Sequence, residues 1–361
     1  GANNVAIGST ALSANTTGCF NTALGASTLL VNQTGICNVA IGASALRCNT
    51  ASNNIAVGVQ PLYYNTSGTN NTAIGTKALF CNTTANNNTA VGYNSLLNNT
   101  TGADNTAIGR DALKLNTTAA QNVAIGTCAL YTTTTGANNT SVGNYSSKLN
   151  TTGLNNVSVG YAALCSNTTG QQNVAVGKSA GDVTTTGSNN IMIGKGSDAD
   201  ASGTNNVIAM GENVVSINNA VTFGNGGTDS RIAFGATSIT APSDQRLKED
   251  IQEDTAGLSF INDLRPVTYK WRQEKDIPEE MRTHVAGSTK RYNNDKVNHG
   301  FIAQEVKEAI DKHPELKDGF DMWTEESTMD GRQRVAEGAL IPMLVKAIQE
   351  LKAEIDELKN K

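Results

Sequence analysis

A serine and a lysine five residues apart, Ser243 and Lys248, are the residues of this chain whose types could do covalent chemistry together. A serine hydroxyl becomes a useful nucleophile only when a neighbouring base accepts its proton, and a lysine can do so only in its neutral form. The pKa of an ordinary lysine, near 10.4, must therefore fall by roughly 3 units for work near neutral pH. Burial and the nearby Arg246 would both lower it. On its own, this pair is common by chance and is better explained as part of a polar loop.

The spacing of the two residues also constrains the backbone that must carry them. Side chains five residues apart face opposite sides of a strand and lie about 140° apart on a helix. A turn, or a lysine from another protomer, must therefore bring the hydroxyl and the amine together.

The composition of the chain changes near residue 242. Residues 1–242 hold all six cysteines, no tryptophan or histidine, 8 of the 27 Lys and Arg residues and 7 of the 32 Asp and Glu residues. This contrast predicts two differently built parts. The net charge of -5 gives no basic patch for nucleic acid, and the apolar runs are too short for a membrane helix. Because Gly1 is not an initiator Met, we expect further sequence upstream.

The first part of the chain is a repeat. A glycine after an aliphatic residue returns about every 17 residues, and the unit reads approximately Asn-Asn-Thr/Val-Ala-Ile-Gly-x-x-Ala-Leu-x-x-Asn-Thr-Thr-Gly-x. Such a period predicts stacked coils rather than a globular domain. The glycines are Gly8, Gly25, Gly42, Gly58, Gly75, Gly92, Gly109, Gly126, Gly143, Gly160, Gly177, Gly194 and Gly211.

Each repeat predicts short strands joined by tight turns. Val5 and Ile7 share one face of a strand while Ala6 points the other way, and Leu12 gives a second apolar anchor after a bend. The Asn-Thr-Thr-Gly element supplies turn chemistry. Two short strands and two turns per repeat predict a mainly β fibrous rod, a β-solenoid or β-roll over residues 1–211, followed by a β-rich neck over 212–242.

The rod is also expected to associate with copies of itself. Each repeat has only three or four apolar side chains, and the small alanine face invites another chain to approach closely, so we predict a homo-oligomer along the whole rod. The Asn-Thr-Ala-Ile-Gly pattern resembles the head repeats of YadA-type trimeric bacterial adhesins, although their unit is shorter. That resemblance covers residues 1 to about 211.

The cysteines and acids of the rod do not predict a metal or catalytic site. The cysteines lie at several phases of the repeat without CxxC pairs or nearby histidines, which favours small core or rung positions. The rod acids form no evident carboxylate pair of the kind that hydrolyses glycans. We therefore expect no metal, no cofactor and no activity on external substrates. The cysteines are Cys19, Cys37, Cys48, Cys81, Cys128 and Cys165.

Four elements in order distinguish the last 119 residues: Ser243-Asp244-x-Arg246-x-Lys248, Leu264 to Trp271, His299 to Val306, and a helix from about Ala339 to Leu358. This set, over residues 243–361, resembles the C-terminal intramolecular chaperone of endosialidases and other phage tail spikes and fibres, a self-cleaving family with a Ser-Lys dyad. The resemblance implies an α+β domain that trimerises, guides folding of the preceding fibre and then cuts itself off.

The same resemblance implies roles for individual residues. By position, Ser243 is the nucleophile, Lys248 the general base, and Pro242-Ser243 the scissile bond. Cleavage would be gated by assembly, because an isolated monomer leaves Lys248 solvated. Residues that could support this site, each with a plain structural alternative, are Asp244, Arg246, His299, Gln304 and Glu305.

Two helices and a loop are expected in this C-terminal domain. Residues 301–313 predict a helix stopped by Pro314, and residues 272–298 predict an extended polar loop. The final helix spaces Ile341, Leu344, Ile348, Leu351, Ile355 and Leu358 as a coiled-coil seam. Ile at a and Leu at d favours two strands in isolated coiled coils, but the short seam on a larger domain leads us to expect three.

Together these features predict a viral, phage-like tail fibre or spike, located in the virion. Its rod would bind the host or act as a spacer, with a surface receptor such as a glycan as partner. Its C-terminal chaperone would form the homotrimer and then self-cleave before Ser243 as a serine endopeptidase acting once. The alternatives are a cellular trimeric adhesin at the cell surface, or a structural fibre whose chaperone remains as a permanent cap.

Overall fold

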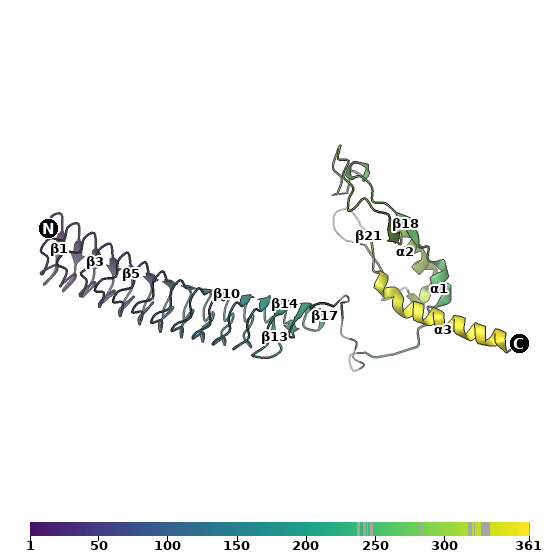
Figure 1. Cartoon of the computed structure of the whole chain (residues 1–361), viewed down its shortest axis with the longest axis horizontal. Coiled ribbons are helices and arrows are strands. Elements are labelled where there is room, and N and C mark those ends of the chain that lie inside the picture. The colour runs from purple at the N-terminus through teal and green to yellow at the C-terminus, as the bar shows by residue number, and fades with distance from the viewer. Residues whose placement is uncertain are drawn as a thin grey trace. The chain divides into compact units, whose positions relative to one another are not determined.

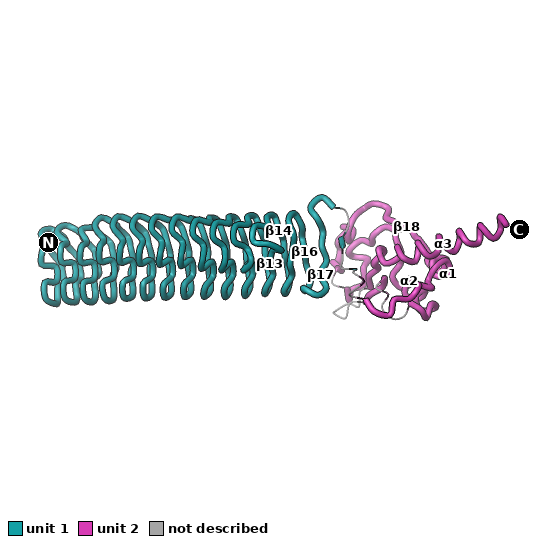
Figure 2. The backbone as a smooth tube through the Cα atoms, turned by 90° about the horizontal axis from the view of Figure 1, so that it is seen from below, with its two compact units in different colours: residues 1–244 teal, residues 245–361 magenta. Residues whose placement is uncertain are grey.

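The computed structural model describes residues 1–360 apart from 237–238, 241–242, 244, 246–247, 282, 317–319, 321 and 326–332. The chain divides into two compact units, residues 1–244 and 245–361 (Figure 2). In the part of the chain that is described, no helix is long and apolar enough to cross a membrane.

The first unit is a β-solenoid, as predicted: its coils stack into one parallel sheet with one strand per coil (Figure 1). Neighbouring strands pair in register one repeat apart, so Ala6 lies beside Ala23 and Ile7 beside Leu24. The strands of this ladder are β1 (Val5–Ile7), β2 (Thr22–Leu24), β3 (Val39–Ile41), β4 (Ile55–Val57), β5 (Thr72–Ile74), β6 (Thr89–Val91), β7 (Thr106–Ile108), β8 (Val123–Ile125), β9 (Thr140–Val142), β10 (Val157–Val159), β11 (Val174–Val176), β12 (Ile191–Ile193) and β14 (Val207–Glu212).

The alanine face of each strand points into its own coil, so our expectation that it would meet another chain was wrong. Ala23, Ala40 and Ala56 are fully buried, and they pack against the leucines of the opposite leg, such as Leu29 and Leu46. The interior of a coil is so narrow that alanine and leucine fill it. The larger Val and Ile side chains are therefore left on the outside of the strand.

The second leg of the coil is not the strand that we expected in most coils. Leu12, Leu29 and Leu46 have left-handed backbone angles, with φ values of 53°, 48° and 49°. A residue in this conformation cannot continue a strand. The leg is therefore a chain of turns, and a second strand forms only in β13 (Asp198–Ala199) and β15 (Val215–Ser216), which pair with each other.

A buried ladder of asparagines, one per coil from Asn21 to Asn190, connects neighbouring coils by hydrogen bonds. Asn71 shows the arrangement: its backbone N–H donates to Oδ1 of Asn54 at 3.0 Å, and its Nδ2 donates to the carbonyl of Ala85 at 2.8 Å. Because buried polar groups cost free energy when they are unpaired, each asparagine depends on the coils beside it. This explains why asparagine recurs so strictly in the repeat.

The strand-end glycines are needed for close contact between coils. Gly75 has φ +131°, and a Cβ atom built there would lie 2.5 Å from the carbonyl oxygen of Gly92 in the next coil. No side chain fits that gap without moving the backbone. The strict glycine period therefore reflects both backbone conformation and coil spacing.

The long sheet ends in a reversal of strand direction. β16 (Ala220–Asn225) continues parallel to β14, but β17 (Thr228–Ala233) pairs antiparallel to β16. Arg231 and Thr240 then form an isolated antiparallel bridge. These strands cover the C-terminal edge of the ladder.

The cysteines are all free thiols, and only one of them is a core residue. Cys128 is buried, Cys37 is exposed, and the other four are half-buried. The core position that we favoured holds for Cys128 and is wrong for Cys37. Desolvation raises the pKa of the Cys81 thiol, which makes it less reactive as a nucleophile.

The second unit is a small α/β assembly whose core lies between its helices. Phe260, Val306, Ile310 and Met322 are central members of that core. The predicted helices are confirmed in α2, which Pro314 follows, and in α3. The elements are α1 (Leu258–Asp263), β18 (Val267–Tyr269), η2 (Glu274–Asp276), β19 (Asn298–Gly300), α2 (Ala303–Lys312), η3 (Pro314–Leu316), β20 (Trp323–Glu325), β21 (Gln333–Val335), η4 (Glu337–Ala339) and α3 (Leu340–Lys359).

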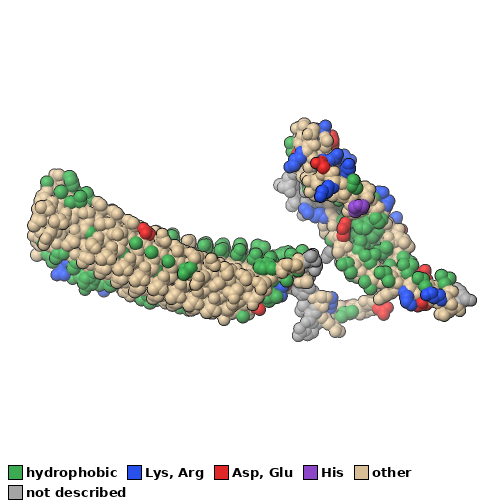
Figure 3. Space-filling view, in the orientation of Figure 1, with side chains coloured by type: hydrophobic (Ala, Val, Ile, Leu, Met, Phe, Trp, Pro, Cys, Tyr) green, Lys and Arg blue, Asp and Glu red, His purple; other side chains and the backbone are tan. Residues whose placement is uncertain are grey.

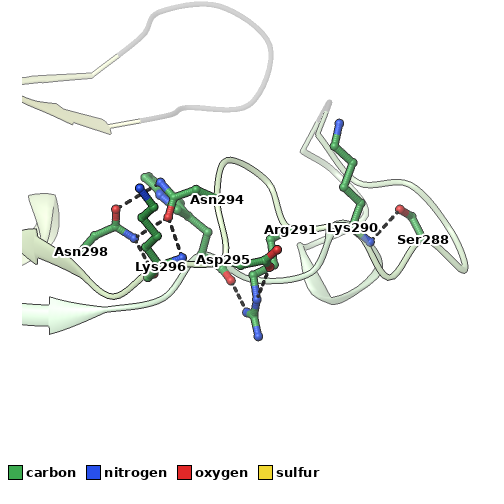
Figure 4. Close-up of polar contacts among 8 residues, drawn as sticks. Ser288, Lys290, Arg291, Asn294, Asp295, Lys296 and Asn298 are labelled. Atoms are coloured by element: carbon green, nitrogen blue, oxygen red, sulfur yellow. Dashed lines mark hydrogen bonds and ion pairs between the residues drawn. The ribbon is translucent and has the colours of Figure 1, made fainter.

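The segment between β18 and β19 folds back on itself, whereas we expected an extended loop. Gln273 and Arg291 form an antiparallel bridge, and the N–H of Glu274 donates to the carbonyl of Lys290 at 2.8 Å. Polar contacts continue toward β19, where Nε of Arg291 lies 3.1 Å from Oδ1 of Asp295 (Figure 4). The segment therefore forms a ribbon held by its own hydrogen bonds.

Candidate functional site

The predicted nucleophile and base lie on either side of the boundary between the two units. Ser243 belongs to the first unit and Lys248 to the second, and both are exposed. The N–H of Lys248 donates to the carbonyl of Gln245 at 3.1 Å. Pro242, Asp244 and Arg246 lie outside the described residues. The roles assigned to all five therefore remain predictions.

Two of the sequence motifs are adjacent strands. β18, from the Leu264 to Trp271 motif, pairs antiparallel with β19, which opens the His299 to Val306 motif, so that Thr268 lies opposite His299. Gly300 lies close to Glu337, because a Cβ atom added at Gly300 would lie 3.1 Å from Oε1 of the Glu337 side chain.

A cleft of about 440 Å³ opens beside this strand pair. His299 and Glu337 bring an imidazole and a carboxylate to its wall. These side chains can exchange protons with a bound segment or form hydrogen bonds with its peptide groups. Its lining residues are Pro266, Val267, Thr268, His299, Gly300, Phe301 and Glu337. Of the predicted support residues that the structure describes, which are His299, Gln304 and Glu305, only His299 lines it.

Glu305 and Gln304 lie on the first turn of α2 and have different surroundings. Both oxygens of Glu305 accept from the guanidinium of Arg265, one of them from Nε at 3.0 Å. This bidentate pair ties the start of α2 to the segment before β18. Gln304 is exposed. The geometry of Glu305 thus accords with the structural alternative for that residue.

His313 forms a second polar centre in this unit, which sequence reasoning did not single out. Its Nε2 lies 2.9 Å from Oδ2 of Asp263 and its Nδ1 lies 3.1 Å from Oε1 of Glu315. The ring is 8% exposed and packs edge-on against Phe260. It joins the end of α1 to the end of α2.

The final helix has one apolar face in the core and another in solvent. Leu340, Met343 and Ala347 are buried. The seam residues are exposed: Ile341, Leu344, Ile348, Leu351, Ile355 and Leu358. The exposed fraction reaches 70% at Leu358 and is 65% at Ile348. Within one chain the seam therefore lacks the apolar partner that its residues are suited to contact.

These motifs, from the serine through the β18–β19 pair to the end of α2, agree with a known family. Residues 243–314 match the chaperone of endosialidase. The family model is named for a peptidase, and the resemblance drawn from the sequence is confirmed over these residues. Comparisons with curated proteins and with solved structures found no match.

The chaperone match covers Ser243, Lys248, the β18–β19 pair and α2, and it ends before β20, β21 and α3. Glu337 and Asp263 were missed because they are distant in sequence from Gly300 and His313, the residues they lie beside, and follow no period. Across the described ranges, no cluster of three or more His, Cys, Asp or Glu side chains is placed to hold a metal ion.

Proposed function

We propose that this chain is part of a phage-like tail spike or tail fibre, whose solenoid rod contacts the host and whose C-terminal domain is its intramolecular chaperone. One observation carries the proposal: a chaperone of endosialidase match begins where a β-solenoid rod ends. Near-identical repeats can pair out of register by whole coils, so a rod of this kind has many competing arrangements. A domain that aligns the chains at one end would remove that ambiguity.

Assembly as a homotrimer is supported by two apolar surfaces. The first is the strand-end ladder, which is the outward strand side chain directly before the glycine in each coil from Ile7 to Phe223, in register from coil to coil. Figure 3 shows hydrophobic side chains in a row along the edge of the rod that carries β10 and β14 in Figure 1. Exposed members include Ile7, Leu24, Ile74, Ile108, Ile125, Val159, Val176, Ile193, Met210 and Phe223.

The second apolar surface is the exposed seam of α3. Contiguous exposed apolar surface of this extent marks an interaction site, and the repeat of the seam suits a coiled coil. Second and third copies of the same chain offer matching surfaces for both the ladder and the seam. In this proposal the chains meet through the ladder and the seam. They do not meet through the alanine face, which is buried inside its own coil.

Self-cleavage is the last step of the proposal. The Ser243 hydroxyl would attack the carbonyl carbon of Pro242 and give its proton to the neutral amine of Lys248. The C–N bond would break as the nitrogen gains a proton, and water would hydrolyse the resulting ester. Lys248 is exposed in the single chain, and in this proposal assembly of the trimer encloses it and gates the reaction. Removal of the chaperone would then trap the folded trimer kinetically.

The experiment is intact and native mass spectrometry of the full chain beside Ser243→Ala and Lys248→Ala. We expect trimers in all three, with a split between Pro242 and Ser243 in the parent alone. Lys270→Ala, at another exposed lysine of the second unit, is the control and should cleave like the parent. A full-length trimer in every sample would overturn cleavage and leave a permanent cap, and a monomer in every sample would overturn the trimer.

A further inference from the structure

The coils of the rod differ from one another mainly at one corner. The strand, the inward leucine and the turn asparagine keep nearly the same residue types throughout, because the interior accepts little else. The fifth residue after the strand-end glycine changes chemistry from coil to coil. From Gly8 to Gly160, this variable row is Ser13, Leu30, Arg47, Tyr63, Phe80, Leu97, Lys114, Tyr131, Lys148 and Cys165.

The variable row lies on the opposite side of the coil from the strand-end ladder. The strand alanine and the leucine of the other leg both point into the coil and pack in one core, so the strand and the leg that carries the variable row form opposite walls of the coil. A trimer formed through the strand-end ladder therefore leaves the variable row open to solvent.

Aromatic and cationic side chains in this row are ordered by contacts along the rod axis. The guanidinium of Arg47 lies 5.4 Å from the ring centre of Tyr63, and its Nη1 donates to the Tyr63 hydroxyl at 2.8 Å. The rings of Tyr63 and Phe80 stack with centres 5.3 Å apart. Lys114 lies 5.4 Å from the ring centre of Tyr131 in the next coil. Such contacts reduce the entropy that each side chain would lose on binding a ligand.

One place along this corner is a formed depression of about 310 Å³. Tyr145 and Tyr161, from consecutive coils, stand at 87° to each other with ring centres 5.9 Å apart. The Lys148 ammonium lies 5.4 Å from the ring centre of Tyr145. The lining residues are Tyr145, Lys148, Leu149, Tyr161, Ala162 and Cys165, which include one cation and no acid among the described residues.

This combination favours a particular class of ligand. A tyrosine ring offers an apolar face for the C–H face of a sugar and a hydroxyl that can bond to the sugar hydroxyls. A lysine offers a point charge that suits a carboxylate. The depression is shallow and has room for one or two sugar units rather than a folded partner.

We propose that the depression formed by Tyr145, Lys148 and Tyr161 binds a carboxylate-bearing sugar unit of a host glycan. The two rings hold the sugar face, and Lys148 pairs with its carboxylate. This inference rests on the proposed role of the rod as the host-contacting part of a fibre, and it specifies where on the rod the contact occurs and with what chemistry.

The test is binding of the full chain to an array of immobilised neutral and carboxylate-bearing glycans, with the affinity for the best ligand measured by calorimetry. Tyr161→Ala should weaken binding about ten-fold or more. Lys148→Met should weaken binding of the carboxylate-bearing glycans and leave binding of their neutral counterparts unchanged. Tyr93→Ala is the matched control, because Tyr93 occupies the same place in its coil as Tyr161 and is 53% exposed compared with 51%.

The outcomes separate this site from the fibre proposal. If the parent binds glycans and Tyr161→Ala binds equally well, the rod contacts sugars elsewhere and the site is wrong. If the parent forms the trimer by native mass and binds no glycan, the site is wrong while the fibre proposal stands. Equal losses in Tyr93→Ala and Tyr161→Ala would also overturn it, since they would point to a property of the whole corner.

Discussion

The Nε2 atom of His313 lies 2.9 Å from the Oδ2 atom of Asp263, at the junction of α1 and α2. Burial lowers the pKa of this histidine, but hydrogen bonds and charges from Asp263 and Glu315 outweigh it, so the pKa is raised overall. The charged imidazole is therefore the form that the folded chaperone domain favours.

This arrangement predicts a pH-dependent stability of the second unit. A raised pKa contributes stability fully below the ordinary histidine value of about 6.5, and the contribution is lost as pH rises through the folded value. We expect the midpoint temperature of unfolding of the helical unit to decrease as the pH is raised from about 6 to about 8. His313→Gln should remove this slope and cost about 1 kcal/mol at the lower pH. His299→Gln, at an exposed histidine, should keep the slope, and an unchanged slope in His313→Gln would contradict the assignment.

A second titrating group lies in the last coils of the rod. Burial raises the pKa of Asp198 to about 7, assisted by a hydrogen bond and the charge of Asp182, although the N–H groups of Val183 and Ala199 oppose the shift. Because folding favours the protonated form, the stability of these coils should fall as pH rises from about 4 to about 7.

Asp182→Asn should remove part of that loss. It deletes the neighbouring charge and keeps a side-chain oxygen that can accept a hydrogen bond, so we expect about 1 kcal/mol of added stability near pH 8, read by hydrogen exchange in β12. Asp104→Asn, in an exposed turn, serves as the control and should change nothing there. A loss of stability in Asp182→Asn would show that its carboxylate makes a favourable contact instead.

The spacing of the coils predicts that Gly75→Ala is severe. The added methyl would meet the Gly92 carbonyl oxygen at 2.5 Å in a backbone with φ +131°, and strain and displacement together should cost about 3 kcal/mol or more. Thermal unfolding followed by the β-sheet signal measures this cost. Gly227→Ala, where nothing lies within 4 Å of the added atom, should be close to neutral. Equal midpoints for the two variants would refute the close-contact explanation.

The exposed seam of α3 predicts that one charge will break the trimer. Ile348→Asp places a carboxylate at a residue that is 65% exposed in the single chain and buried in the proposed assembly, where an unpaired charge costs several kcal/mol. Native mass should show monomers. Gln349→Asp changes the next residue of the helix, which is exposed and is not a seam residue. This variant should remain trimeric. Trimers in both variants would mean that the seam is not an interface.

The sequence predicted the solenoid because the repeat recurs so strictly, but it did not predict which strand face was inside. Alternation in Val5-Ala6-Ile7 defines two unequal faces, and the usual preference for burying the larger side chains would have turned Val and Ile inward. The narrow coil reverses that preference. Leucines such as Leu29 were equally unpredictable as turn residues, since leucine rarely adopts a positive φ.

Like the fold, the candidate site could be predicted only in part from the sequence. The motifs containing Thr268 and His299 were recognised separately, but their pairing as β18 and β19 depends on a contact between distant segments. Glu337 beside Gly300, and Asp263 beside His313, have no local signal at all. Recognition of Ser243 and Lys248 depended on the family resemblance rather than on their spacing.

The asparagine ladder and the glycine contacts have a consequence for how such a rod can change over evolutionary time. Every internal coil presents the same hydrogen bonds to the coil before it and the coil after it. Deleting or duplicating one whole repeat therefore leaves every remaining contact intact and alters reach in steps of about 4.8 Å. The length of the rod can therefore change without any change in the second unit.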